Sequence, residues 1–556
     1  YDVTPPIITI DKIINNSSIP DNTLSYSLSE YAAEATLVFT QVGGESDAQS
    51  PQNISLAGNE LNGGVYIKTS LKNGPDLVNG ANYDIQFTAI DPAGNEATPI
   101  NLTNIAFDNQ SPKLSISRPI DAEQIKTTIV SYMSDEDLAS GYIIFTQTSG
   151  TTDVNSPHRI PLKGSNLTAG VHSDVDLGIT SQLADGGRYE VTIEAYDKAE
   201  NMGEVTPIRD VFFDILPPEL SLSVPASGYH LNTAQLTYAT SEEMGKGQVV
   251  FTRSGGANDP NSPHTVELTG SRLKYGDHIS ESFDNDVTLK DGSIYTIELS
   301  GEDLAGNVAV PVSLKEITYD VSPPAIAISS PAPNGFYNKM ITVFTLNEPL
   351  VSGQIVFDRS GGASDNVSPH RLDLTLEQMK TGTHIDIPIT GLASNAVYSV
   401  WIEGIDRAGN DGKSPEINGI TFDDIPPEIA ITSPVPDAFI NAKTVGLSTN
   451  ETLSKANVVW TWVEGNADPA GTHESTLVGN NLQEGAYTNV NFNPSPLLVS
   501  DAKYKVVFQG TDRAGNASTF ELGMVYFDDQ PPVISGIFPP SNGFTNLNEI
   551  SYELNE

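Results

Sequence analysis

The chain has 556 residues, enough for several domains, and 38% of them are hydrophobic, enough to build folded cores. Asp and Glu total 71 against 28 Lys and Arg, so the formal net charge is -43 at pH 7. Such a polyanion repels nucleic acid and anionic membrane surfaces and attracts divalent cations. The absence of cysteine excludes disulfide-stapled ectodomains and cysteine-ligated zinc modules. No stretch reaches the ~18 apolar residues that a membrane helix needs.

An internal repeat organises the whole chain. An aromatic residue, an Asp, two variable residues and then Ser-Pro or Pro-Pro recur six times, with the Asp at Asp2, Asp108, Asp214, Asp320, Asp423 and Asp528. The periods are 106, 106, 106, 103 and 105 residues, close to one free-standing sandwich domain of about 100 residues. We expect immunoglobulin-like repeats at 1–107, 108–213, 214–319, 320–422 and 423–527, and the start of a sixth, truncated repeat at 528–556. Because Tyr1 lies inside the motif, we expect both ends to be cuts within a longer array.

Within each period the residues predict short strands, as the third repeat illustrates. An alternating run at 219–224 follows the Pro pair, and a second run at 234–240 comes after a corner rich in Pro, Gly and Asn. A third run at 247–252 carries Phe251, and the penultimate strand opens on Tyr295. These segments predict an all-β chain, a tandem array of seven-stranded immunoglobulin-like or fibronectin-III-like β-sandwiches. The recurring Tyr matches the tyrosine corner of such domains, and the third-strand aromatic matches their core Trp.

Three acidic positions recur at fixed offsets. The turn Asp, in Asp-x-Ala-x-Asn, is Asp91, Asp197, Asp303, Asp406 and Asp512. The linker Asp, before the Pro pair, follows 17 residues later in four cases and 16 in the fifth. The strand-end Glu, 28 residues after the linker Asp, is Glu30, Glu136, Glu242, Glu348, Glu451 and Glu556.

The spacing suggests that one carboxylate from the upstream domain, one from the linker and one from the downstream domain meet at each junction. Three such groups repel unless a cation compensates them, and Ca²⁺ takes 6–8 oxygen ligands in flexible geometry. We therefore predict interdomain Ca²⁺ sites with the ligands Asp91, Asp108, Glu136, Asp197, Asp214, Glu242, Asp303, Asp320, Glu348, Asp406, Asp423, Glu451, Asp512, Asp528 and Glu556. The alternative is purely structural, because Asp-x-Ala-Gly-Asn is a good turn and Asp-x-x-Pro-Pro a plausible linker without any ion.

A second recurring motif is Asp-x-x-Ser-Pro-His. His158, His264 and His370 each lie five residues after an Asp, and a second histidine follows 14 residues on. One interpretation is a transition-metal site, but the first repeat has Gln52 and Tyr66 at the two positions, and Gln is a poor ligand for such metals. The alternative is a pair of polar side chains that hydrogen-bond across strands.

No nucleophile–base constellation stands out. Active sites are normally single and lie in a pocket, whereas these motifs recur in most repeats. We therefore predict that the chain is not an enzyme and has no catalytic residue.

The Asp-x-Ala-Gly-Asn turn followed by an aromatic-Asp-x-x-Pro-Pro linker resembles the bacterial immunoglobulin-like repeats of giant cell-surface and adhesin proteins. The resemblance covers essentially the whole chain, although Glu200 replaces the turn Gly in the second repeat. It implies a bacterial source, a secreted or surface location, and long stalks stiffened by interdomain Ca²⁺, much as in cadherins.

We expect a non-catalytic stalk whose five modules span ~200 Å, at ~3.3 Å per strand residue plus linkers. Its partners are neighbouring modules of the same chain, and other copies of itself, a surface receptor or a polysaccharide are further candidates. One alternative is a self-assembling extracellular filament or sheath protein whose modules make lateral contacts. Another is the spacer region of a large secreted polysaccharide-degrading enzyme.

Overall fold

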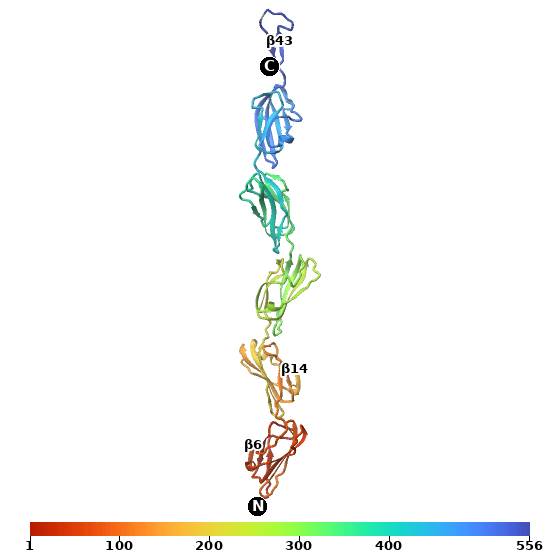
Figure 1. Cartoon of the computed structure of the whole chain (residues 1–556), viewed down its shortest axis with the longest axis vertical. Coiled ribbons are helices and arrows are strands. Elements are labelled where there is room, and N and C mark those ends of the chain that lie inside the picture. The colour runs from red at the N-terminus through yellow and green to blue at the C-terminus, as the bar shows by residue number, and fades with distance from the viewer. Residues whose placement is uncertain (547, 556) are drawn as a thin grey trace.

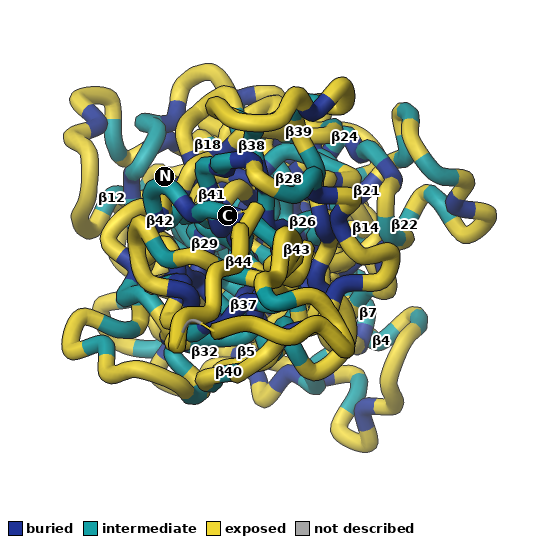
Figure 2. The backbone as a smooth tube through the Cα atoms, turned by 90° about the horizontal axis from the view of Figure 1, so that it is seen from above, coloured by how far each residue is buried: buried dark blue, intermediate teal, exposed yellow. Residues whose placement is uncertain are grey.

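The computed structural model describes residues 1–546 and 548–555 and confirms the all-β prediction. Five β-units follow one another along a single axis from the N-terminus to the C-terminus, and a small hairpin lies beyond the fifth (Figure 1). Seen along that axis, the units overlap around a common centre and exposed loops project outward (Figure 2). No helix among the described residues is long and apolar enough to cross a membrane.

The strands are numbered in chain order, and η marks single 3-10 turns. Repeat 1 contains β1 Ile8–Ile10, β2 Ser18–Ile19, β3 Thr23–Leu28, β4 Glu34–Gly44, β5 Gln52–Ser55, η1 Gly58–Leu61, β6 Gly64–Ser70, β7 Ala81–Ile90 and β8 Ile100–Phe107. Repeat 2 contains β9 Leu114–Arg118, β10 Gln124–Ile125, β11 Ile129–Ser134, β12 Leu138–Gly150, β13 His158–Pro161, η2 Gly164–Leu167, β14 Gly170–Asp176, η3 Thr180–Gln182, β15 Gly187–Asp197, β16 Met202–Gly203 and β17 Ile208–Phe213. Repeat 3 contains β18 Leu220–Val224, β19 His230–Leu231, β20 Gln235–Thr240, β21 Met244–Gly256, β22 His264–Glu267, η4 Gly270–Leu273, β23 Gly276–Ser282, β24 Ser293–Asp303 and β25 Val312–Tyr319.

The remaining repeats follow the same order. Repeat 4 contains β26 Ile326–Ser330, β27 Phe336–Tyr337, β28 Met340–Leu346, β29 Leu350–Gly362, β30 His370–Asp373, β31 Gly382–Ile389, β32 Ala396–Asp406, β33 Asp411–Lys413 and β34 Ile417–Phe422. Repeat 5 contains β35 Ile429–Ser433, β36 Phe439–Ile440, β37 Val445–Thr449, β38 Leu453–Gly465, β39 Thr472–Thr476, η5 Gly479–Leu482, β40 Gly485–Val490, β41 Ala502–Asp512 and β42 Ala517–Phe527. The terminal hairpin pairs β43 Ile534–Phe538 with β44 Ser551–Leu554.

Each repeat is built from two facing sheets. In repeat 1, one sheet has the order β1-β3-β6 and the other the order β2-β8-β7-β4-β5, and the later repeats keep this arrangement. The short segment β2 pairs in parallel with β8, so the first part of the chain crosses from one sheet to the other. If β1 and β2 are taken as one strand that changes sheet, the repeat has the predicted seven strands.

Strict alternation of side chains creates the core of each sandwich. Along β15 every second residue is buried, because successive side chains of a strand point to opposite faces. The predicted aromatics are all in the interior, with Phe145 and Trp460 both 0% exposed. Five separate hydrophobic clusters result, one in each repeat. Each module therefore has its own core.

The recurring Tyr forms the predicted corner and also organises a buried polar network. The Tyr189 hydroxyl accepts the Ala184 backbone N–H at 2.8 Å and donates to Asp153 Oδ2 at 2.7 Å. His158 Nε2 contacts the same oxygen at 2.7 Å. Burial opposes the charge of Asp153, but these hydrogen bonds outweigh it and lower the pKa of the carboxyl. The network holds the β12–β13 loop, which carries Asp153, against β15, which carries Tyr189.

The variant Tyr189→Phe should destabilise repeat 2 by about 1–3 kcal/mol, because the buried Asp153 carboxylate loses one of its donors and the Ala184 backbone N–H loses its partner. Hydrogen exchange of the β15 amides should report the loss. Tyr196→Phe is the matched control, since Tyr196 lies on the outer side of the same strand and its hydroxyl donates to the partly exposed Met202 Sδ, at 3.7 Å. Equal protection in the two variants would contradict the assigned role.

Candidate metal centre

The predicted grouping of the turn Asp with the linker that follows it is wrong. The turn at Asp91 closes one end of the sandwich, and β8 then runs the length of the module before the chain reaches Asp108. Eight strand residues at ~3.3 Å each place the two carboxylates at opposite ends, roughly 25 Å apart. The turn Asp instead meets the linker that precedes its own module.

Five groups of three carboxylates result, one at the start of each repeat. In every group one oxygen from each residue lies within 4.8 Å of the other two. The groups are Asp2, Glu30 and Asp91; Asp108, Glu136 and Asp197; Asp214, Glu242 and Asp303; Asp320, Glu348 and Asp406; Asp423, Glu451 and Asp512. The structure thus brings together the three predicted residue types and adds Asp2 and Glu30. Asp528 lies in the last linker, and Glu556 lies outside the described residues.

The Asn of the turn motif holds the turn and the linker together. In repeat 2, Asp197 Oδ1 accepts the backbone N–H groups of Ala199 and Asn201 at 2.7 and 2.9 Å. The Asn201 side-chain amide donates to Asp197 Oδ2 at 2.8 Å and to the backbone oxygen of Asp108 at 2.7 Å. In the other four repeats the equivalent Asn amide also donates to the backbone oxygen of the linker Asp; these residues are Asn95, Asn307, Asn410 and Asn516. This amide fixes where the linker carboxylate lies.

Burial and neighbouring charges raise the pKa of the strand-end Glu in four of the five groups. It is half-buried and lies just beyond the third labelled strand of its repeat, as Glu136 lies beyond β11. Burial, and next the charges of Asp108 and Asp197, raise the pKa of Glu136 to about 7. The same causes raise the pKa of Glu242 and of Glu451 to about 7 and also raise the pKa of Glu348. The site therefore favours a proton or a cation over three free carboxylates.

The upstream module contributes a loop residue that the sequence analysis missed. The backbone N–H of Ile215, next to the linker Asp, donates to Asp185 Oδ1 at 2.8 Å. Asp291 accepts from Val321 in the same way, and Asn79, Ser394 and Ser500 take this place at the other junctions. The charge of Asp185 is among the causes that raise the pKa of Asp214. The recurrence of a polar residue 29 or 30 positions before these amides was the available signal.

Neither interpretation of the histidine motif holds. His158 lies on β13 and bonds to Asp153, whereas His172 lies on β14 in the other sheet and stacks on Tyr132 with ring centroids 4.7 Å apart. In repeat 1, Gln52 bonds to Asp47 while Tyr66 stacks on Tyr26, so these two do not pair either. The groups of possible metal ligands found among residues 1–546 and 548–555 include no histidine.

Comparison with known proteins finds no matching family model and no curated relative. Among solved structures, a tetra-tandem repeat in the extending region of a large adhesion protein is similar, at 16% identity over 76% of this chain and 100% of that chain, with a TM-score of 0.24. The chicken CNTN1 FN1–FN3 domains share 13% identity over 57% of this chain and 99% of theirs, with a TM-score of 0.21. The fibronectin(III)-like modules of Clostridium thermocellum CbhA share 14% identity over 36% of this chain and 94% of theirs, with a TM-score of 0.20.

Without divalent cations, the raised pKa values predict that the chain is more stable in mild acid than at alkaline pH. A carboxyl whose pKa rises from 4.5 to about 7 on folding contributes stability that is lost as pH increases across that interval. In chelator, the thermal midpoint should therefore be higher at about pH 5.5 than at about pH 8. Calorimetry at the two pH values checks this. An equal or reversed order in chelator would show that the Glu carboxyls are not crowded.

Proposed function

We propose that this chain is a non-catalytic structural stalk of a large bacterial surface protein or adhesin, stiffened by calcium at its interdomain junctions. The observation that carries the proposal is the repetition of one three-carboxylate group at the start of every module. A single acidic group is common on protein surfaces, but five with the same partners and the same Asn bond indicate a shared requirement. The array of β-sandwiches, each with its own core, supports the stalk.

The chemistry of the groups suits Ca²⁺. All members are carboxylates, so the site offers hard oxygen donors, which suit Ca²⁺, Mg²⁺ or Mn²⁺ rather than the softer transition metals. Backbone carbonyls of the linker and water can complete the 6–8 oxygens that Ca²⁺ takes, whereas Mg²⁺ demands a tighter octahedron. A bound cation would remove the repulsion that raises the pKa of the Glu.

The mechanical effect follows from where the three residues lie. The linker Asp is the first residue after the last strand of the upstream module, as Asp214 is after β17. A cation shared with Glu242 and Asp303 would clamp the end of that strand to the downstream module. The upstream loop, through the bond between Asp185 and Ile215, fixes the same segment from the other side. The clamp would thereby limit the angle between consecutive modules.

The variant Glu242→Gln should remove one binding site. Calorimetric titration of the whole chain should give about five calcium ions for the native protein and about four for the variant, since each group would hold one ion. In chelator the variant should have a higher thermal midpoint than the native chain, because a charge is lost from a crowded group. With calcium present, the native chain should have the higher midpoint. Glu243→Gln is the control, since Glu243 pairs with Lys274 outside the group. Unchanged stoichiometry in Glu242→Gln would refute the site.

Calcium should also lengthen the chain in solution. With calcium, small-angle scattering should give a maximum dimension near the ~200 Å expected for five modules in line. In chelator the mean dimension should fall, because junctions without the clamp bend more freely and repulsion between the anionic modules is screened beyond a Debye length of ~10 Å. If the maximum dimension and the thermal midpoint are the same with calcium and with chelator, calcium does not stiffen the chain.

A further inference from the structure

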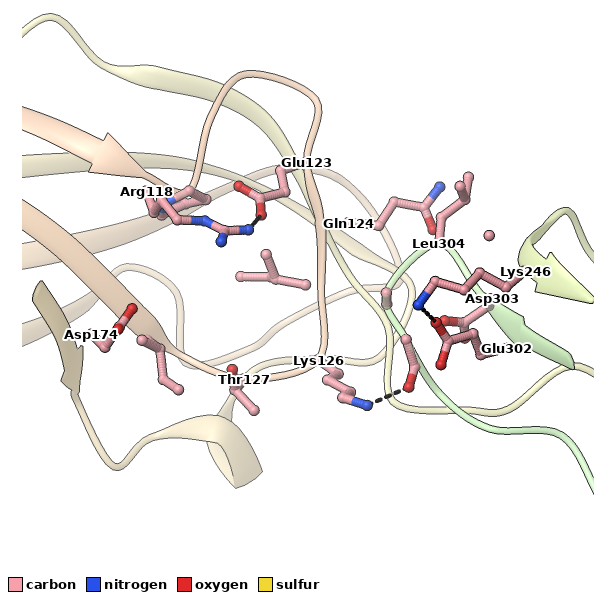
Figure 3. A pocket seen from close by; sticks show the side chains of 16 residues that line it. Arg118, Glu123, Gln124, Lys126, Thr127, Asp174, Lys246, Glu302, Asp303 and Leu304 are labelled. Carbon is pink, nitrogen blue, oxygen red and sulfur yellow. Dashed lines mark hydrogen bonds and ion pairs between the residues drawn. The ribbon is translucent and has the colours of Figure 1, made fainter.

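A second contact joins consecutive modules, separate from the carboxylate groups. Between repeats 2 and 3, Lys126 follows directly after β10 and extends across the junction (Figure 3). Its Nζ donates a hydrogen bond to the backbone oxygen of Gly306, in the Asp-x-Ala-Gly-Asn turn of repeat 3. Gln124 and Leu304 line the same interdomain cavity. The upstream corner therefore touches the downstream turn directly.

The same corner and turn meet at the next two junctions. A Cβ added at Gly409 of repeat 4 would lie 3.5 Å from Nδ2 of Asn232, which belongs to repeat 3. A Cβ added at Gly515 of repeat 5 would lie 3.6 Å from Nδ2 of Asn338, which belongs to repeat 4. At Gly94, in the turn of repeat 1, such an atom would meet nothing within 4 Å. The distances at Gly409 and Gly515 are ordinary van der Waals distances, so at both junctions the corner of the preceding module lies beside the turn Gly.

One junction adds an aromatic contact. The Arg513 guanidinium of repeat 5 lies 5.4 Å from the ring centroid of Phe336, which belongs to repeat 4. This distance is within the range in which a cation is attracted to the face of a ring. Arg513 follows the turn Asp directly, so the contact belongs to the same corner and turn.

The junction between repeats 1 and 2 differs on both sides. Pro20 occupies the place of Lys126 and has no side-chain donor. Opposite it, Glu200 replaces the turn Gly and is held at a positive φ of 68°. Pro20 and Glu200 line one cavity between the two repeats, at the place where the next three junctions have a polar side chain beside a glycine.

We propose that the corner after the second short strand of each module is a docking surface for the next module's turn, and that it sets the junction angle without a cation. Lys126, Asn232 and Asn338 are its central residues. Because intrachain domain interfaces are small and relative motion is the default, a few such contacts decide how far a junction bends. The junction between repeats 1 and 2, with Pro20 and Glu200, is then the most flexible point among the first five repeats. This docking acts beside the calcium clamp and does not depend on it.

Distances between spin labels test the proposal in the full chain. The chain has no cysteine, so pairs of introduced cysteines at equivalent exposed positions of neighbouring repeats carry the only labels. In chelator, the distance distribution across repeats 1 and 2 should be roughly twofold wider than across the three following junctions, because at those three a polar side chain of the corner lies against the turn Gly. Equal widths at all four junctions would overturn the proposal, whatever calcium does to them.

Two variants assign the effect to the named residues. Lys126→Ala should widen the distribution between repeats 2 and 3 to that of the junction between repeats 1 and 2. Lys246→Ala is the matched control, because Lys246 lines the same cavity but pairs with Glu302 inside repeat 3 at 2.7 Å. The double variant Pro20→Asn and Glu200→Gly should narrow the first junction. An equal effect of Lys126→Ala and Lys246→Ala, or no narrowing by the double variant, would refute the docking surface.

Discussion

Three carboxylates lie within 4.8 Å of one another at the start of each of the five repeats, and their like charges are the constraint that this end of the module must accommodate. Three carboxylates are fixed there by unrelated causes: a turn that binds Asp197 through backbone amides, a linker held by Asn201, and the end of β11, which places Glu136. The turn and the linker are held most firmly, because Asp197 accepts two backbone N–H groups and the Asn201 amide binds the backbone oxygen of Asp108. A proton or a cation would relieve this repulsion, and the calcium that we propose suits a site made only of oxygen donors.

The other end of each module is satisfied internally. There the buried Asp153 accepts from both Tyr189 and His158, and in repeat 1 Asp47 accepts from Tyr83 and Gln52 instead. Histidine and glutamine are interchangeable here because each supplies one donor to the same oxygen. The two ends of a sandwich thus differ. At one end the buried Asp is hydrogen-bonded to side chains of its own module, and at the other three carboxylates lie close together.

A rod built this way is not uniform. The carboxylate groups are nearly identical from junction to junction, but the residues around them vary. The upstream loop offers a carboxylate at Asp185 and Asp291, an amide at Asn79 and a hydroxyl at Ser394. The docked corner varies independently, from Lys126 to Asn338. Repetition sets the common architecture, and these substitutions adjust each junction.

The sequence by itself determined the all-β class, the period, the core and the types of residue at the site. Alternation along a strand and a Tyr or Phe at a fixed offset depend on local geometry, so Phe145 and Tyr189 could be placed without a structure. Only the tertiary structure decided which of these residues meet. Asp91 joins Asp2 rather than Asp108 because β8 carries the chain to the far end of the sandwich. His158 and His172 are separated because their strands belong to opposite sheets. The spacing along the chain shows which residues recur. Which residues they meet depends on the direction of the strands and on which of the two sheets each strand joins.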